Sequence, residues 1–180
     1  MNTFFTSDTH FFHKNILKYT DRPFKDVEEM NEALIDQWNR VVGPDDVIYH
    51  LGDVIFGGKD KIPLILPRLK GIKILVAGNH DNKNRLSTHF KEIHNYLEVS
   101  GHNGERFILS HFPFEVWNLS HRGSFHLHGH SHGSLPSIGR RLDVGIDGYG
   151  TSFNYGPIPM EVISMVLSNR PIHFSDHHGK

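Results

Sequence analysis

Apolar segments of strand length recur along this 180-residue chain, and a polar turn follows each of them. The segments with clear strand character are residues 2–7, 47–51, 72–77, 106–110 and 124–128. The turns after them carry carboxylate, amide or imidazole side chains. In chain order they are Asp8-Thr9-His10, Gly52-Asp53, Gly78-Asn79-His80-Asp81, His111 and Gly129-His130-Ser131-His132. Because sheets present functional groups at the ends of their strands, this pattern predicts a functional site built from these turns.

Helical patterns occupy other segments. Asp26 can cap a helix whose apolar side chains recur at three- and four-residue steps as far as Val41, and Gly43 and Pro44 end it. A final helix is predicted over residues 160–167, with Pro159 at its start. Residues 61–69 can form only a short helix, because two prolines interrupt the segment.

The remaining segments predict a hairpin, a late strand and a loop. Residues 96–100 and 106–110 flank Asn103-Gly104, which is a strong hairpin signal. Residues 142–146 are a further strand candidate, and residues 10–24 read as a loop. No linker or internal repeat divides the chain, so we expect a single domain over residues 1–180, with a disordered polar tail from about residue 173.

The composition argues against several classes of protein. Lys and Arg total 19 and Asp and Glu total 20, so the formal charge of −1 gives no overall attraction to nucleic acid. There is no cysteine, which leaves carboxylates and the 16 histidines to bind any metal. No apolar run is long enough to span a membrane, and no signal-peptide pattern precedes Asp8. We therefore expect a cytoplasmic protein without a membrane partner.

The polar turns together supply the ligands that a pair of divalent metal ions needs. Asp8 and His10 are two residues apart at a strand end, so both side chains can reach one ion. His130 and His132 repeat that spacing in a turn that begins with glycine. The carboxylate of Asp53 has two oxygens and can bridge two ions. Each motif alone is more often a turn, a cap or a solvated histidine pair, but their number and shared strand-end position favour a two-metal centre for phosphoryl transfer.

The order of the motifs resembles that of the calcineurin-like metallophosphoesterases. In that family Asp-x-His, Gly-Asp, Gly-Asn-His-Asp/Glu, His and Gly-His-x-His follow one another, and all five blocks are present here between Asp8 and His132. The resemblance implies an α/β (α+β) fold of four layers, in which two packed mixed β-sheets are flanked by helices. It implies two sets of metal ligands: Asp8, His10, Asp53 and His132 for the first ion, and Asp53, Asn79, His111 and His130 for the second.

The resemblance also implies an activity, the hydrolysis of phosphate mono- or diesters with two divalent ions as cofactors. Mn²⁺ is the expected ion, and Fe, Zn²⁺ or Ni²⁺ also suit oxygen and imidazole ligands. A hydroxide shared by the two ions would attack phosphorus, with Asp53 as the ligand common to both ions. His80 would act as general acid on the leaving group, because the ordinary pKa of an imidazole lies near neutrality. Asp81 could orient His80 or have a purely structural role.

Two departures narrow the resemblance. The protein serine/threonine phosphatases continue their Gly-Asp block into Asp-Arg-Gly, whereas Val54 to Gly58 follow Asp53 here and include no arginine. Those phosphatases have Glu after Gly-Asn-His, whereas this chain has Asp81. The chain is therefore more similar to the small bacterial, archaeal and phage members of the superfamily. We expect a small phosphorylated substrate, for example a nucleotide.

Polar and aromatic residues outside the motifs have weaker predicted roles. The candidates for substrate contact are His13, Lys14, Arg22, Trp117, His121 and Arg122, although each alone is more typical of a surface or core residue. His50 has the opposite strand parity to Asp53 and is expected to face away from the metals. His126 and His128 could support the metal turn. His177 and His178 lie in the polar tail.

Two other functions are alternatives to a small-molecule phosphoesterase. A nuclease would apply the same metal chemistry to a nucleic acid, but the near-neutral charge and the small size disfavour it. A non-catalytic scaffold would keep the fold and lose metal ligands, whereas every ligand position of the pattern is filled in this chain.

Overall fold

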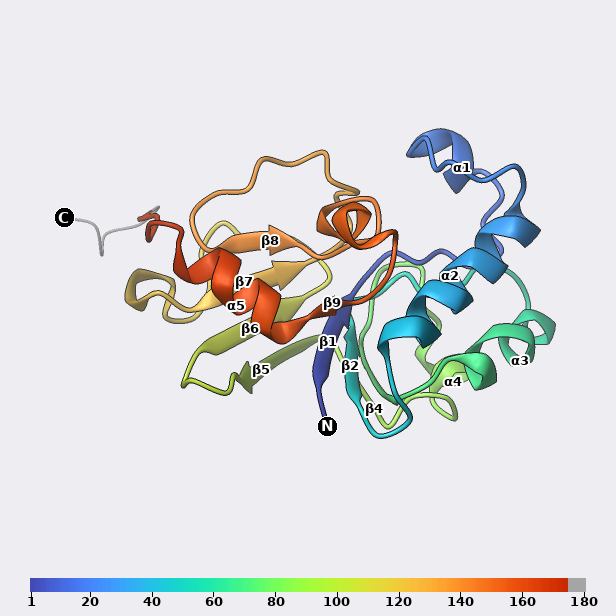
Figure 1. Cartoon of the computed structure of the whole chain (residues 1–180), viewed down its shortest axis with the longest axis horizontal. Helices are drawn as coiled ribbons and strands as arrows, with labels where there is room; N and C mark the ends of the chain where they lie inside the picture. Colours follow the sequence, from blue (N-terminus) through green and yellow to red (C-terminus); the bar gives the residue numbers. More distant parts are fainter. Residues whose placement is uncertain (175–180) are drawn as a thin grey trace.

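The computed structural model describes residues 1–174 and contains two β-sheets packed against each other (Figure 1). The first sheet has five strands in the order β4-β3-β2-β1-β9. β1 to β4 pair in parallel, and β9 pairs antiparallel with β1. The strands are β1 (Thr3–Thr6), β2 (Val47–His50), β3 (Ile72–Val76), β4 (Glu92–His94) and β9 (Ile158–Pro159).

The second sheet has four strands in the order β5-β6-β7-β8. β5 and β6 form the predicted hairpin and pair antiparallel, whereas β6, β7 and β8 are parallel. The strands are β5 (Tyr96–Ser100), β6 (Arg106–Ser110), β7 (Phe125–His128) and β8 (Arg141–Asp143).

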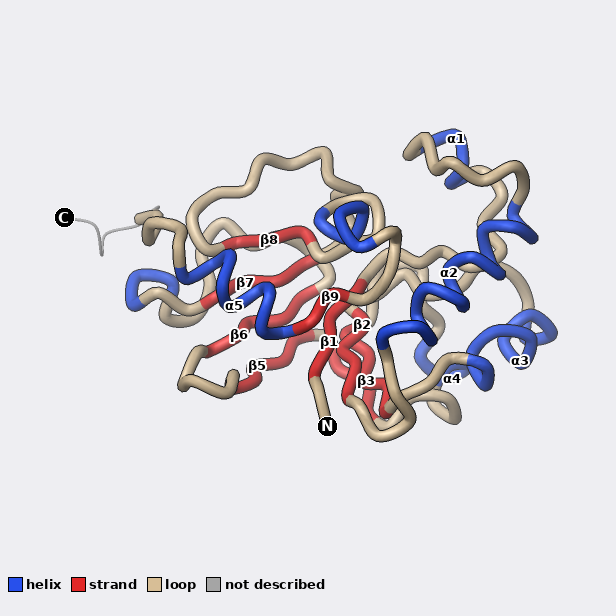
Figure 2. The backbone as a smooth tube through the Cα atoms, in the orientation of Figure 1, coloured by secondary structure: helices blue, strands red, loops and turns tan. Residues whose placement is uncertain are grey.

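Helices flank the two sheets (Figure 2). α2 (Val27–Val41), α3 (Ile62–Ile65) and α4 (Lys83–Leu86) contribute to the core on one face of the first sheet, and α5 (Met160–Ser168) packs with the second sheet. α1 (Ile16–Tyr19) lies on the long segment between β1 and α2. Within residues 1–174, four 3₁₀ turns complete the elements: η1 (Lys59–Lys61), η2 (Leu66–Arg68), η3 (Ser120–Arg122) and η4 (Tyr149–Phe153). Two mixed sheets flanked by helices confirm the predicted fold class.

Successive side chains on the strands of the first sheet point to opposite faces, so the sheet contributes to two separate hydrophobic cores. On β1, Phe4 packs into the cluster that contains α2, whereas Phe5 packs into the cluster between the sheets. The Phe5 ring lies 5.4 Å from the ring of Phe107 on β6. On β3, Leu75 and Val76 divide between the same two clusters. The first sheet is thus buried on both faces, as its nearly continuous apolar strands require.

The helix predictions agree with the structure except where prolines intervene. α2 starts after Asp26, whose side chain accepts a hydrogen bond from the Glu29 N–H at 2.9 Å. The segment around Pro63 and Pro67 forms η1, α3 and η2 in succession rather than one helix. α5 starts after Pro159, as predicted.

Several short elements differ from the sequence prediction. α1 interrupts the segment that we expected to be a loop, and the short strands β4 and β9 were not predicted. The strand predicted over residues 142–146 ends at Asp143, because the Asp143 side chain accepts the N–H of Gly145 and turns the chain. Most of the predicted polar tail, including His177 and His178, lies outside the described residues.

The carboxyl ends of β1, β2, β3, β6 and β7 each lead into one of the polar motifs. The loops also bond to one another directly. Asp8 N–H donates to Gly52 O and His10 N–H donates to Asp53 O, both at 3.0 Å. Gly129 N–H donates to His111 O at 3.0 Å. Among residues 1–174, no helix is long and apolar enough to cross a membrane.

Candidate metal centre

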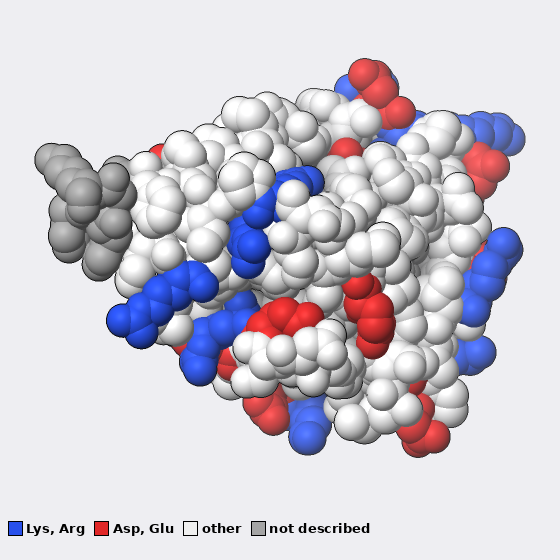
Figure 3. Space-filling model, turned by 60° about the vertical axis from the view of Figure 1, so that its left-hand side comes forward, with Lys and Arg blue, Asp and Glu red and all other residues white. Residues whose placement is uncertain are grey.

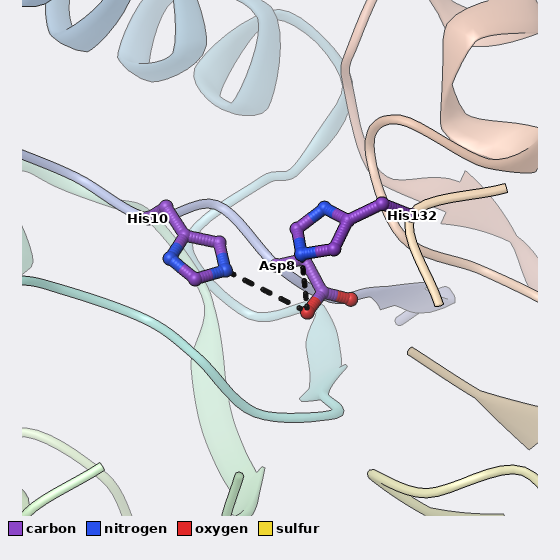
Figure 4. A group of neighbouring side chains, drawn as sticks. All are labelled: Asp8, His10 and His132. Carbon is purple, nitrogen blue, oxygen red and sulfur yellow. Dashed lines mark ion pairs between the residues drawn. The ribbon is translucent and has the colours of Figure 1, made fainter. Parts of the chain in front are cut away.

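The loops after β1 and β7 bring three of the predicted metal ligands together (Figure 4). Asp8 Oδ1 lies 3.8 Å from His10 Nε2 and 3.9 Å from His132 Nε2. Asp8 and His10 are buried, and His132 is half-buried. These separations are too long for hydrogen bonds. They are slightly above the roughly 3–3.5 Å between two ligands of one ion whose bonds are about 2.1 Å long.

A second group of ligand atoms overlaps the first and contains Asp8, Asp53 and His111. Asp53 Oδ2 lies 3.6 Å from His10 Nε2 and also 3.6 Å from His111 Nε2. Asn79 Oδ1 lies 3.1 Å from the same His111 nitrogen. One carboxylate oxygen of Asp53 is therefore shared between the imidazoles of the two predicted ligand sets.

His130 and His80 border these groups. The His130 ring is 5.2 Å from the His111 ring, and the His130 N–H donates to Asp8 Oδ2 at 3.0 Å. The side chain of His80 is 47% exposed, and its Nε2 lies 4.0 Å from Asp53 Oδ2. The His80 N–H donates to Asp53 Oδ1 at 3.0 Å. Both imidazoles are thus at the solvent side of the centre, where a bound molecule could reach them.

The ligand loops adopt a backbone conformation that L-residues rarely occupy. Positive φ angles occur at Asp8 (57°), His10 (49°), Asp53 (56°), His130 (65°) and His132 (47°). Such a conformation is uncommon for residues other than glycine and costs on the order of 1–3 kcal/mol per residue. Strain concentrated on five predicted ligands points to a functional rather than a purely structural origin of these turns.

Glycines allow the loops to approach the carboxylates. A Cβ at Gly129 would collide with Ser7 Oγ and Asp8 Oδ2, and a Cβ at Gly78 would collide with Asp53 Oδ1. The space beside both carboxylates is therefore available only to a residue without a side chain.

The chemistry of the donors fits a bound cation. His10 Nε2 and Arg141 Nε are the buried side-chain polar atoms in residues 1–174 that lack a hydrogen-bond partner. His10 Nε2 nevertheless lies near two carboxylates. Burial raises the pKa of Asp8 well above its usual range and lowers that of His10. A divalent ion would give the orphan nitrogen a partner and offset the burial of carboxylate charge.

Asp147, which sequence reasoning missed, supports the first group. Its Oδ2 accepts a hydrogen bond from His132 Nδ1 at 2.7 Å, which leaves Nε2 of that ring facing Asp8. Burial lowers the pKa of His132, but the hydrogen bond to Asp147 and the Asp8 carboxylate outweigh burial and raise it overall. A carboxylate that fixes the tautomer and orientation of a metal-binding imidazole is a common outer partner in metal sites.

Arg22, a candidate for substrate contact, instead forms hydrogen bonds within the protein. Its guanidinium is buried and donates to both Asp147 carboxylate oxygens, at 2.8 and 2.6 Å. It also donates to the backbone carbonyls of Thr9 and Asp8, at 2.9 and 2.7 Å. Arg22 thus joins Asp147 to the first ligand loop. A buried, paired arginine is not available to hold a phosphate.

His13 supports His10 in a comparable way. The Nδ1 atoms of the two rings lie 3.2 Å apart, so Nδ1–H of His10 can donate to His13 and leave Nε2 free for an ion. The His13 ring stacks on Phe56 at 3.8 Å with an interplanar angle of 12°. Its position just beyond the Asp-x-His motif is the signal that sequence reasoning could have used.

His50 belongs to neither group of candidate ligand atoms, and its side chain supports the ligand loops through hydrogen bonds. Its Nδ1 accepts the Gly52 N–H at 3.2 Å, and its Nε2 lies 3.0 Å from Thr9 Oγ1. Thr9 Oγ1 in turn donates to Val54 O at 2.8 Å. The network connects the first and second motifs. Burial lowers the pKa of His50 to about 3, so the ring is neutral at physiological pH.

Asp81 has a structural role rather than orienting His80. Its carboxylate accepts the backbone N–H groups of Asp53, Val54 and Gly78, at 2.8, 3.0 and 2.8 Å. It therefore ties the second motif to the third.

Three further candidates, His126, Trp117 and His128, also make structural contacts. His126 Nδ1 lies 3.0 Å from Ile108 O, and its Nε2 accepts the Phe114 N–H at 2.9 Å. Trp117 Nε1–H donates to Ser124 O at 3.2 Å, and its ring packs 5.3 Å from that of His126. His128 Nδ1 bonds the carbonyl of Gly129, the first residue of the last motif, at 2.9 Å.

Comparisons with known proteins identify relatives of this chain. No model of a known protein family matches it. The structure is similar to the crystal structure of a protein of unknown function, AQ665 from Aquifex aeolicus. Their TM-score is 0.72 at 28% identity, over 92% of this chain and 98% of that one.

Two sequence relatives are closer in identity. The Gene 66 protein of Mycobacterium phage L5 is 31% identical over 83% of this chain and 88% of its own length. The uncharacterized protein MJ1445 of Methanocaldococcus jannaschii is 36% identical over 89% of this chain and 88% of its own length. At that identity and coverage, the chain belongs to the same protein family as MJ1445 of Methanocaldococcus jannaschii.

Proposed function

We propose that this protein is a calcineurin-like metallophosphoesterase that hydrolyses phosphate esters with two divalent ions. The observation that carries the proposal is the position of Asp53, whose Oδ2 lies 3.6 Å from the imidazoles of both His10 and His111. A carboxylate between two ligand groups is the arrangement that a two-metal centre requires. The unpartnered, buried His10 Nε2 supports the same assignment.

The proposed ligands are those that the motifs predicted. Asp8, His10, Asp53 and His132 would hold one ion, and Asp53, Asn79, His111 and His130 the other. When bound, the ions lower the pKa of water and offset the charge that develops on the phosphate oxygens. We propose Mn²⁺ as the ion, with Fe, Zn²⁺ and Ni²⁺ suited to the same ligands.

We assign the general acid to His80. Hydrolysis forms a bond between a water oxygen and phosphorus and breaks the bond between phosphorus and the leaving oxygen. The leaving oxygen takes a proton from the His80 imidazolium, the attacking water releases a proton to solvent, and the ring regains one from solvent. The bond from His80 N–H to Asp53 Oδ1 fixes the backbone here, while the 47% exposed side chain stays accessible to substrate.

Metal content and turnover test the proposal together. Protein supplied with Mn²⁺ should bind about two ions and hydrolyse p-nitrophenyl phosphate or its bis ester. Asp53→Asn should lose both properties, and Asp60→Asn, at an exposed aspartate, should lose neither. If protein with a full complement of metal is inert on a broad panel of mono-, di- and cyclic esters, the enzyme proposal is wrong.

The role of His80 has its own test. His80→Ala should slow hydrolysis of an ester with an alkyl leaving group more than that of a p-nitrophenyl ester, because p-nitrophenolate leaves without a proton. A typical general acid contributes about 10²–10⁴-fold. Equal losses on the two esters would exclude proton donation by His80.

The wild-type protein and the Asp53→Asn variant also distinguish the two alternatives, a nuclease and a non-catalytic scaffold. The formal charge of −1 supports a small ester over a nucleic acid as substrate. Figure 3 shows both basic and acidic side chains on the face that it draws. Degradation of single-stranded DNA or RNA that Asp53→Asn abolishes would instead support a nuclease. A folded protein that takes up no metal would support a scaffold.

A further inference from the structure

A cleft of about 510 Å³ opens beside the candidate metal centre. It lies between α1 and the loop that joins β7 to β8, and both run along the upper side of the molecule in Figure 1. His130 and His132 line the cleft from the metal centre. A group attached to a phosphate at the centre could therefore extend into this space.

The cleft is lined by apolar side chains and, besides the two histidines, by the hydroxyl residues Thr20, Ser131 and Ser134. Tyr19 and Leu135 line it and are 71% and 44% exposed, and the buried Ile16 lies beside them. Lys, Arg, Asp and Glu are absent from the described residues that line it. Apolar side chains that line a cleft together with a few polar groups are typical of a ligand-binding site. An aromatic ring such as Tyr19 offers a face on which a planar group can stack.

Tyr19 is connected to the metal centre through its neighbours. Its ring meets the edge of the His13 ring at 6.2 Å between centroids, and His13 contacts His10. Tyr19 is therefore linked to the predicted ligand His10 through one intervening residue, His13.

A second, smaller pocket of about 40 Å³ lies beside His80. Asn82 and Arg85 line it, and it shares no lining residue with the cleft. Each space is lined by a histidine near His10, because the His10 ring lies 5.9 Å from the His80 ring and 5.1 Å from the His132 ring. A phosphodiester carries two organic groups, so one could occupy the cleft while the other lies beside His80, whereas a phosphomonoester carries only one.

We propose that the substrate is a phosphodiester whose retained ester group is an uncharged aromatic moiety bound in the cleft against Tyr19 and Leu135, while the leaving group lies beside His80. The inference rests on the proposed phosphoesterase function. The products are the monoester of the retained group and the alcohol of the leaving group, by the same hydrolytic step. Tyr19 is then a specificity-determining residue.

Two diesters with a common leaving group test this assignment. Bis(p-nitrophenyl) phosphate retains an aryl group, and methyl p-nitrophenyl phosphate retains a methyl group. We expect Tyr19→Ala to lower kcat/KM for the bis ester about 5- to 50-fold, as loss of an aromatic stacking partner does, and to leave the methyl ester within about twofold. Tyr19→Phe keeps the ring and should keep the wild-type ratio. Lys18→Ala, at an exposed neighbour on α1 outside the cleft, is the matched control.

Failure of this inference is distinguishable from failure of the proposed function. If neither diester is hydrolysed by protein with its full metal content, the phosphoesterase proposal fails. If both are hydrolysed but Tyr19→Ala leaves their ratio unchanged, the function stands and the cleft assignment is overturned. A higher kcat/KM for p-nitrophenyl phosphate than for its bis ester would also overturn the diester assignment. Circular dichroism and metal content of the variants establish that each is folded and loaded.

Discussion

The two ends of the candidate metal centre are built differently. At the closed end, which we define as Asp8, His10 and His132, the side chains are buried or half-buried, and residues outside the motifs hold both imidazoles. At the open end, defined as Asn79 and His130, both residues are exposed. The His130 ring contacts the rings of His111 and Phe112, and within residues 1–174 it makes no hydrogen bond.

The difference indicates that the two ends of the centre have different roles, one held rigidly by neighbouring residues and the other open to solvent. Hydrogen bonds from His13 and Asp147 hold the imidazoles of the closed end, so the folded protein itself would supply the geometry for the proposed ion there. The proposed ligands at the open end are exposed, so they would be freer to adjust to an ion. Asp53 and His111 lie between the two ends and belong to the buried part. We expect substitutions to have effects that decrease from the closed end to the open end.

The largest effect is expected from His10→Ala, which removes a proposed metal ligand of the closed end. The protein should retain about one ion instead of two, and turnover should fall by more than the roughly 10–100-fold that is typical for loss of an outer partner. Metal analysis after dialysis and kcat/KM on a diester measure both. His102→Ala, at an exposed histidine of the hairpin turn, is the control. Two retained ions in His10→Ala would remove the distinction between the ends.

The next largest effect is expected from Asp147→Ala. It leaves the Arg22 guanidinium buried without its carboxylate, which typically costs about 3–5 kcal/mol, and it frees the His132 ring. Urea unfolding of the metal-free protein gives the stability change, and a metal titration should show about 10–100-fold weaker binding.

A surface ion pair gives the matched control for Asp147→Ala. Arg68 and Glu32 lie 2.5 Å apart with both side chains largely exposed, so Glu32→Ala should cost less than about 1 kcal/mol. Similar losses of stability in the two variants would contradict a special role for the buried pair.

The sequence predicted those parts of the centre whose residues are close together along the chain. It did not predict contacts between residues that are far apart along the chain. The meeting of the candidate ligands was predictable because each motif is local and follows an apolar strand. Asp147 was not predictable, because its partner Arg22 is 125 residues away and neither lies in a motif. The two-residue β9 and three-residue β4 are too short to show a period, whereas α2 and the hairpin of β5 and β6 have long patterns or a clear turn signal.

Protonation of His50 at acidic pH should lower the free energy of unfolding. At moderate pH we expect this loss of stability to be smaller than that caused by Asp147→Ala. The pKa of this ring is lowered to about 3 in the folded protein, against about 6.5 when unfolded. The unfolded chain therefore binds the proton first, so this contribution to stability is complete above about pH 6.5 and is lost as the pH falls toward 3.

The variant His50→Gln isolates that contribution. It cannot take up the proton, so its stability between pH 6.5 and 4 should fall less steeply than that of the wild type, by up to a few kcal/mol over the interval. Urea unfolding of metal-free protein at several pH values measures the slopes. Parallel slopes would show that His50 does not carry the acid sensitivity.

The smallest effect is expected from His130→Ala at the open end. The ring is exposed and without a hydrogen-bonded support among the described residues, so a water molecule can take its place at modest cost. We expect about tenfold weaker binding of one ion, unchanged binding of the other, and stability within about 0.5 kcal/mol of the wild type. Stepwise metal titration with calorimetry resolves the two events. His130→Ala could instead weaken the binding of both ions as much as His10→Ala does. The open end would then be as important for metal binding as the closed end, and the distinction between the two ends would be wrong.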